Sequence, residues 1–168
     1  MLVIGSGGAG KSTLAARLGA RLDLPVVHLD ALYWRPGWVA TPDPEWRETV
    51  ARLAARDAWV MDGNYGGTLD RRLAACDAVV FLDLPRAVCL AGVLRRWLRY
   101  AGRTRPDMAP GCPERLTWAF VRWVWDYPRR RRAGVLRRLA ALPPDRRVIV
   151  LQSREAVEQF LAGPPRAA

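Results

Sequence analysis

Five short apolar runs alternate with stretches of helical character along this chain. The runs cover residues 2–5, 26–30, 59–63, 78–83 and 146–152, and each has the length and composition of a β-strand. Strands that alternate with helices are typical of a parallel sheet covered on both faces. The pattern therefore predicts an α/β fold with three layers, in which a five-stranded parallel sheet carries helices on both sides.

The helical stretches between these runs have recognisable apolar faces and start signals. After the first run, Leu14, Leu18 and Leu22 recur at helical spacing. Asp43-Pro44-Glu45 combines a capping acid, a proline at the first helical position and a further acid in the first turn, which predicts a helix start. Trp46, with Val50, Leu53 and Ala54, then forms the face that we expect to be buried.

The second half of the chain is predicted to contain two longer helices separated by a loop. Pro85 opens the first, and the segment from Gly102 to Pro113 is rich in glycine and proline. A long helix should begin near Pro113, and we expect Trp118, Trp123 and Trp125 to pack it against the sheet.

The length of 168 residues suits one domain. We expect that domain to cover residues 1–162, with a lid region at about 95–115 and a flexible tail at 163–168. Met1 leads directly into the first strand and no apolar run could span a bilayer, so we expect a cytoplasmic protein with no membrane partner. The oligomeric state is left open.

Cysteine and histidine usage argues against a zinc site. The three cysteines are widely spaced, and His28 is the only histidine in the chain. Neither a C-x-x-C pair nor a Cys/His cluster is present in the sequence. We therefore expect ordinary thiols at Cys76, Cys89 and Cys112.

The charge of the chain is concentrated in one segment. Residues 85–138 hold 14 arginines and three acids, an excess equal to the net charge of +11 of the whole sequence. Such a block could neutralise a polyanion, close over the phosphates of a small ligand, or form a solvated helix face. For the run Arg129-Arg130-Arg131-Arg132, a solvated face and a role in binding both stay open.

One motif is specific for phosphate binding. Lys11 is the only lysine of the chain, and it lies in the pattern G-x-x-x-x-G-K-[ST] between the first strand and the first helix. Backbone N–H groups at the start of that helix and its positive dipole end favour phosphate oxygens. The motif predicts a P-loop that binds ATP through Gly5, Ser6, Gly7, Gly8, Ala9, Gly10, Lys11, Ser12 and Thr13.

A P-loop enzyme also needs groups that hold Mg²⁺. Ser12 supplies the hydroxyl, and an acid at the end of a neighbouring strand should complete the site. Asp30, Asp62 and Asp83 each terminate an apolar run, at the sheet edge where ligands of open α/β folds bind. Asp62 is favoured because Gly63 follows it and removes side-chain bulk next to the phosphates.

Three blocks of sequence resemble a known bacterial family. The blocks are His28-Leu29-Asp30-Ala31-Leu32-Tyr33-Trp34, Met61-Asp62-Gly63-Asn64-Tyr65-Gly66-Gly67-Thr68 and Gly102-Arg103-Thr104-Arg105-Pro106-Asp107-Met108. Together they are similar to the FlaR-like family of DNA topology modulation proteins, whose members resemble adenylate kinase and other small P-loop kinases. The likeness runs from about residue 2 to residue 161.

The resemblance implies roles for two acids. The block that contains Asp62 is similar to a D-G-[FY]-P-R block of nucleotide kinases, but Asn64 and Tyr65 replace the Pro-Arg pair, which argues against ordinary nucleoside monophosphate specificity. Asp30 falls where shikimate and related kinases place an aspartate that binds the acceptor. The resemblance thus implies that Asp30 orients or deprotonates an acceptor hydroxyl.

In such kinases, arginines of a lid close over the transferred phosphoryl group. Arg95 and Arg99 are four apart and Arg96 and Arg99 are three apart, so each pair can share a helix face, and Arg103 and Arg105 follow in the loop. We select Arg95, Arg99 and Arg103 as the lid arginines.

The sequence thus favours a small P-loop kinase with a nucleotide kinase-like fold. It would use Lys11, Asp30 and the three lid arginines to move the γ-phosphoryl group of MgATP to a nucleotide or a hydroxyl metabolite. Two alternatives stay open: a nucleic-acid-associated ATPase that regulates DNA topology, and a nucleotide-binding module without turnover. No helix-turn-helix or RNA-binding motif supports a nucleic-acid partner.

Overall fold

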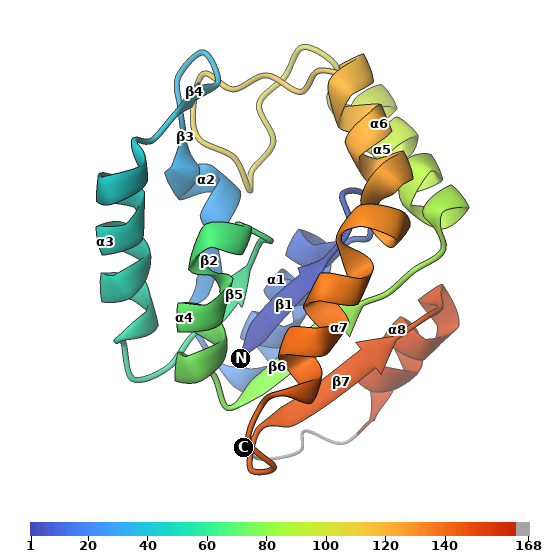
Figure 1. Ribbon diagram of the computed structural model, residues 1–168. Coiled ribbons are helices and arrows are strands. Elements are labelled where there is room, and N and C mark those ends of the chain that lie inside the picture. The colour runs from blue at the N-terminus through green and yellow to red at the C-terminus, as the bar shows by residue number, and fades with distance from the viewer. Residues whose placement is uncertain (164–168) are drawn as a thin grey trace.

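The computed structural model describes residues 1–163, and the remainder of the expected 163–168 tail lies outside the described residues. A five-stranded parallel sheet with the order β2-β5-β1-β6-β7 forms its centre (Figure 1). The strands are β1 (Leu2–Gly5), β2 (Val26–His28), β5 (Val60–Asp62), β6 (Ala78–Leu82) and β7 (Arg147–Leu151). All five match predicted runs, and the predicted parallel sheet is confirmed.

Side chains of β1 alternate between two separate cores, as the two-residue period of a strand requires. Leu2 and Ile4 face a core that includes residues of α3 (Asp43–Ala54), α4 (Leu69–Ala75) and α7 (Arg132–Ala140). Val3 faces a second core with residues of α1 (Lys11–Leu22), α5 (Arg86–Tyr100) and α8 (Arg154–Ala162). Helices therefore cover both faces of the sheet, as predicted.

Several elements depart from the sequence expectation. The run at 26–30 is a strand only to His28, because Leu29 begins a short helix, α2 (Leu29–Tyr33). A two-stranded hairpin of β3 (Trp34–Arg35) and β4 (Val39–Ala40), and a 3-10 turn, η1 (Gly66–Thr68), were not expected. Strands of two residues are too short for an alternating pattern to mark them.

The long helix expected near Pro113 begins later and is divided. The helix α6 covers Trp118–Arg130, Thr117 caps it by accepting a hydrogen bond from the Phe120 N–H, and α7 follows after Arg131. The expected packing of its tryptophans holds only for Trp123, which contacts both cores. Trp118 and Trp125 are exposed.

The segment 101–117 leaves α5, extends across the top of the molecule towards the hairpin and returns to α6, which lies beside α5 (Figure 1). Met108, Ala109 and Cys112 form a small core there with Trp34 and Trp38 of the hairpin. The Trp38 indole N–H donates to the Pro113 carbonyl, and the Gly37 N–H donates to the Gly111 carbonyl. These contacts hold the segment over the carboxyl edge of the sheet.

Candidate functional site

The P-loop joins β1 to α1 in the geometry that its sequence predicts. Gly8 and Gly10 have φ values of 75° and 96°, which side chains rarely adopt, and this explains the two glycines. Lys11 turns back over the loop, and its Nζ donates to the Ser6 carbonyl at 2.9 Å. Burial lowers the pKa of Lys11, while the charges of Asp30 and Asp62 oppose that effect.

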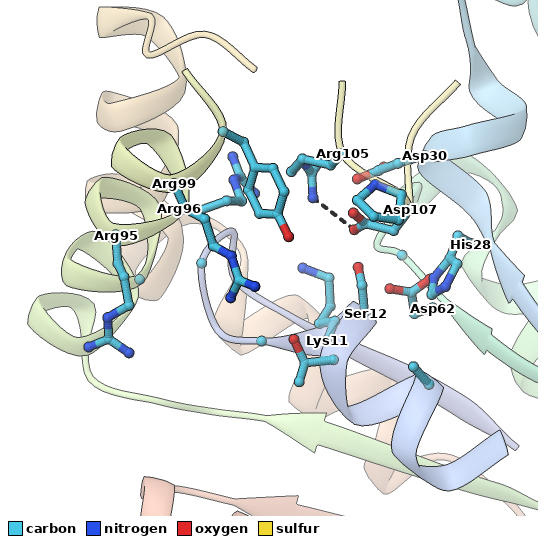
Figure 2. A pocket seen from close by; sticks show the side chains of 18 of the residues that line it. Lys11, Ser12, His28, Asp30, Asp62, Arg95, Arg96, Arg99, Arg105 and Asp107 are labelled. Atoms are coloured by element: carbon cyan, nitrogen blue, oxygen red, sulfur yellow. Dashed lines mark hydrogen bonds and ion pairs between the residues drawn. The ribbon is translucent and has the colours of Figure 1, made fainter. Parts of the chain in front are cut away.

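A cavity of about 450 Å³ opens above the P-loop at the carboxyl edge of the sheet (Figure 2). Lys11, Ser12, Thr13, Asp30 and Asp62 line one side of it. Residues of α5, of the segment 101–117 and of α8 line the other, namely Arg95, Arg96, Arg99, Arg105, Asp107 and Arg154. The structure thus brings most of the predicted site residues into one cavity.

The three aspartates occupy different positions. Asp62 is the buried last residue of β5, and its Oδ1 lies 2.8 Å from the Nδ1 of His28. Asp30 lies in the first turn of α2 and accepts a hydrogen bond of 2.6 Å from the Tyr65 hydroxyl. Asp83 lies outside this cavity, where it pairs with Arg132 at 2.7 Å.

The hydrogen bond to Asp62, more than any other influence, raises the pKa of His28. Burial opposes this effect, and the charges of Asp62, Asp107 and Asp30 reinforce it. His28 therefore favours the protonated form more than a free histidine does, beside a carboxylate that it orients.

Asn64 joins the loop after β5 to the P-loop through two hydrogen bonds. Its side-chain amide donates to the Gly5 carbonyl at 2.7 Å and accepts from the Gly5 N–H at 3.1 Å. The residues that depart from the nucleotide kinase pattern thus have roles of their own, since Asn64 joins two loops and Tyr65 holds Asp30. Buried Arg72 supports the same loop by donating to the carbonyls of Gly63, Asn64 and Tyr65.

Gly63 is required for a second reason besides the expected one. It has a φ of 129°, and a Cβ atom there would lie 2.9 Å from the Cβ of Leu29. The glycine therefore relieves crowding against α2 as well as bulk beside the cavity.

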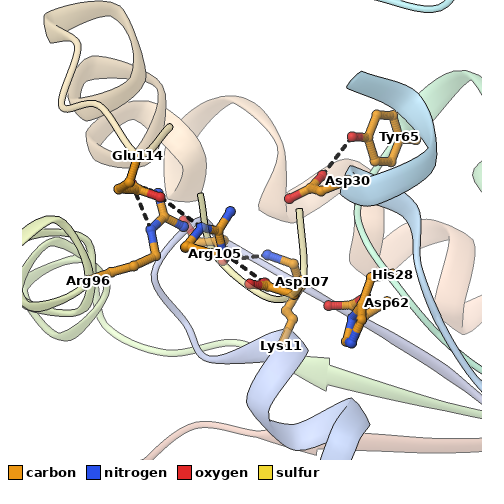
Figure 3. Close-up of polar contacts among 10 residues, drawn as sticks. Lys11, His28, Asp30, Asp62, Tyr65, Arg96, Arg105, Asp107 and Glu114 are labelled. Atoms are coloured by element: carbon orange, nitrogen blue, oxygen red, sulfur yellow. Dashed lines mark hydrogen bonds and ion pairs between the residues drawn. The ribbon is translucent and has the colours of Figure 1, made fainter. Parts of the chain in front are cut away.

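Among the selected lid arginines, Arg95 and Arg99 line the cavity. Arg103 is exposed and lies outside it. Arg105 takes that place. Its guanidinium lies 2.7 Å from Asp107 and 2.7 Å from Glu114, and Glu114 also pairs with Arg96 at 2.9 Å (Figure 3). A buried acid between two arginines couples the segment 101–117 to α5.

Arg105 was considered but not selected, and Arg154 was missed, for different reasons. The sequence gives equal local signals for Arg103 and Arg105, and only the distant Glu114 distinguishes them. Arg154 could have been found from its place in the sequence. It comes directly after Ser153, which caps α8, and both follow the end of the last strand, at the sheet edge where ligands bind.

Ser12 and Asp62 fit a magnesium ion of the P-loop type. Mg²⁺ in phosphate sites uses one or two carboxylates and completes its coordination with phosphates and water. Asp62 offers one buried carboxylate that lines the cavity together with the Ser12 hydroxyl. Residues 1–163 contain no cluster of three or more histidine, cysteine or acidic side chains that could hold a metal by itself.

One curated protein shares substantial sequence with this chain. The uncharacterized protein YqaC of Bacillus subtilis is 30% identical over 130 residues, which cover 74% of this chain and 70% of YqaC. The chain belongs to the YqaC family. No family model matches it.

The fold of this YqaC-family chain is also that of small P-loop kinases. Shikimate kinase from Acinetobacter baumannii superposes with a TM-score of 0.57 at 17% identity, over 96% of this chain and 87% of the other. Gluconokinase from Sinorhizobium meliloti gives 0.52 at 19% identity, over 96% and 88%. Shikimate kinase from Aquifex aeolicus gives 0.53 at 15% identity, over 96% and 93%.

Within residues 1–163, no helix is long and apolar enough to cross a membrane.

Proposed function

We propose that this protein is an ATP-dependent phosphotransferase that moves the γ-phosphoryl group of MgATP to a hydroxyl group of a small acceptor. The observation that carries the proposal is the convergence of Lys11, Ser12, Asp62, Asp30 and the arginines of α5 on one cavity. Phosphoryl transfer requires positioning and charge stabilisation more than covalent catalysis, and this cavity has groups for both.

The P-loop residues would bind the triphosphate. Backbone N–H groups of Gly7 to Ser12 would contact phosphate oxygens, and Lys11 would leave the Ser6 carbonyl to reach the β- and γ-positions. Ser12 and Asp62 would hold Mg²⁺, which when bound neutralises charge on the β- and γ-phosphates. His28 would keep the Asp62 carboxylate oriented through the 2.8 Å contact.

Asp30 would act on the acceptor. Its carboxylate, held by the Tyr65 hydroxyl, would accept the proton of the acceptor hydroxyl as the oxygen attacks the γ-phosphorus. The bond from that phosphorus to the β,γ-bridging oxygen breaks, so the products are ADP and a phosphate monoester. Arg96, Arg99 and Arg105 would stabilise the negative charge on the transferred group.

The test is phosphoryl transfer from radiolabelled ATP to a panel of nucleosides, nucleotides and hydroxy acids, with Asp30→Asn and Asp62→Asn as variants. We expect Asp62→Asn to weaken Mg²⁺-dependent nucleotide binding at least tenfold. Asp30→Asn should keep the ATP affinity of the wild type and lose transfer by at least 100-fold. Transfer by Asp30→Asn at the wild-type rate would remove Asp30 from the mechanism, and absence of MgATP binding to the wild type would contradict the whole proposal.

A further inference from the structure

A second cavity adjoins the first on the side away from Arg95 and Arg154. It has a volume of about 540 Å³ and shares Lys11, Asp30, Gly63, Arg96 and Arg105 with the first. The two cavities therefore meet where the proposed phosphoryl transfer takes place. A compound in the second cavity could place a hydroxyl group at Asp30 while ATP occupies the first.

Aromatic rings form the walls of this second cavity. Trp34 and Trp38 of the hairpin lie on one side, with centroids 5.4 Å apart. Phe120 and Trp123 of α6 stack at 6.0 Å with an interplanar angle of 8°, and Tyr65 adds a fifth ring. Ring faces stack favourably on planar ligands and offer few hydrogen bonds to an aliphatic polyol.

Positively charged side chains outnumber carboxylates in the lining of this second cavity. Four cationic side chains, Lys11, Arg96, Arg105 and Arg115, line it against the single carboxylate of Asp30. Glu114 lies outside the lining and pairs with both Arg96 and Arg105. Within the described part of the chain, no carboxylate pairs with Arg115, whose guanidinium lies 5.0 Å from the ring centroid of Trp38.

Arg115 is thus a cation that stacks on an aromatic wall and keeps its hydrogen-bond donors for a ligand. Guanidinium groups match carboxylates and phosphates with two parallel hydrogen bonds. A ligand ring that packs beside Trp38 would bring an anionic substituent within reach of Arg115. An uncharged acceptor would leave Arg115 without an anionic partner.

We propose that the phosphoryl acceptor is a compound with a planar ring, an anionic group and a free hydroxyl group. The ring would lie between the hairpin and α6, Arg115 would bind the anion, and Asp30 would take the hydroxyl proton during transfer from ATP. This assignment rests on the proposed function for the transfer step, whereas the binding preference is independent of it. Two sources share this chemistry, namely nucleoside phosphates and aromatic hydroxycarboxylates.

Calorimetric titration with matched probes tests the assignment on the full chain. The probe 4-(hydroxymethyl)benzoate is compared with benzyl alcohol, and 3′-AMP is compared with adenosine, so that each pair differs in the anion. Gluconate provides an anion without a planar ring. All titrations are made with MgADP present and again without it, so that failure to bind nucleotide, which contradicts the proposed function, does not hide binding at the second cavity.

We expect one ring-and-anion probe to bind at least tenfold more tightly than its uncharged partner and than gluconate. In Arg115→Gln the charged and uncharged probes should bind with equal affinity. Trp38→Leu should weaken binding of the ring-and-anion probe at least tenfold. The affinity for MgADP should be unchanged in both variants. The matched controls are Arg129→Gln and Trp118→Leu, exposed residues outside both cavities. The probe pair with the larger affinity ratio shows whether the acceptor is a nucleoside phosphate or an aromatic hydroxycarboxylate.

Three results would overturn the assignment. They are equal affinity for charged and uncharged partners, an unchanged ratio in Arg115→Gln, and no binding of either ring-and-anion probe at millimolar concentration. Melting temperatures of all variants within a few degrees of the wild type establish that the comparison concerns folded protein.

Discussion

The single lysine of this chain makes its phosphate-binding role directly testable. Lys11→Ala removes the ammonium that contacts the Ser6 carbonyl in a loop at the cavity wall. We expect turnover to fall at least 100-fold, about 2.7 kcal/mol of transition-state stabilisation, with stability changed by less than about 1 kcal/mol. ATP turnover and thermal melting measure the two effects, and Arg129→Ala is the control. Wild-type turnover in Lys11→Ala would exclude the P-loop from the reaction.

The single histidine likewise gives one titration signal. The contact with Asp62 raises the pKa of His28 in the folded protein above 6.5, so the pair stabilises the fold fully below pH 6.5. That contribution is lost as the pH rises through the raised pKa. NMR titration of the imidazole without Mg²⁺ should therefore give a pKa above 6.5.

Asp62→Asn provides the comparison for His28. We expect the imidazole pKa to fall in this variant, because the strongest cause of the shift is removed. The free energy of unfolding of the wild type should exceed that of the variant at pH 6 by more than it does at pH 9. An imidazole pKa unaffected by the substitution would contradict the His28–Asp62 pair.

At the scale of elements, α5 lies directly against the P-loop without a side chain between them. A Cβ atom on Gly92 would lie 2.1 Å from the Gly8 carbonyl oxygen, and one on Gly8 would lie 2.1 Å from the Cys89 carbonyl oxygen. Both glycines are needed for this approach.

Gly92→Ala should push α5 and the P-loop apart. We expect a loss of about 1–3 kcal/mol in stability, as for other overpacked sites, and ATP binding at least tenfold weaker. The matched control is Gly134→Ala in α7, where the added Cβ would meet only Arg138 at 3.7 Å. That substitution should raise stability by up to about 1 kcal/mol through helix propensity. Chemical denaturation and calorimetry with ATP compare the variants, and equal ATP affinity in the two would contradict the close contact.

The elements differ in how much of them could be predicted from the sequence. The strands β1, β5, β6 and β7 follow from local apolar runs and were predicted within about two residues, and the helices α1 and α3 follow from their apolar faces. The hairpin of β3 and β4 was missed because it is held by contacts with the segment 101–117, far along the chain. In the same way, the role of Asn64 depends on Gly5, 59 positions away.

At the scale of the whole molecule, part of the positive charge of the arginine-rich segment 85–138 is paired within the protein. Six of its 14 arginines pair with carboxylates: Arg96, Arg105, Arg122, Arg130, Arg132 and Arg138. The run 129–132 is itself divided, since Arg132 binds Asp83, Arg131 lies over Trp123 and Arg130 pairs with Asp126. Arg129, Arg130 and Arg131 are nevertheless exposed, as a solvated face requires, and only Arg132 is partly buried.

This distribution predicts weak binding to DNA. A protein that contacts about six phosphates loses roughly a thousandfold in affinity between 50 and 200 mM salt. We expect duplex DNA to bind with a dissociation constant above about 1 μM at 150 mM salt. Arg99→Ala should lower ATP turnover at least tenfold, whereas Arg129→Ala should leave turnover unchanged. Fluorescence titration across salt and turnover assays give both results. Submicromolar DNA binding, with turnover insensitive to Arg99→Ala, would favour the nucleic-acid function instead.

The contact between Gly8 and Gly92 also limits how the parts of the molecule can move. Because the two backbones are in contact, α5 cannot move relative to the sheet without moving the P-loop. The segment 101–117 is tied to the same arrangement, because buried Glu114 pairs with both Arg96 of α5 and Arg105. We therefore expect the arginines of α5, and Arg105 with them, to keep their positions relative to the P-loop when a phosphate ligand binds.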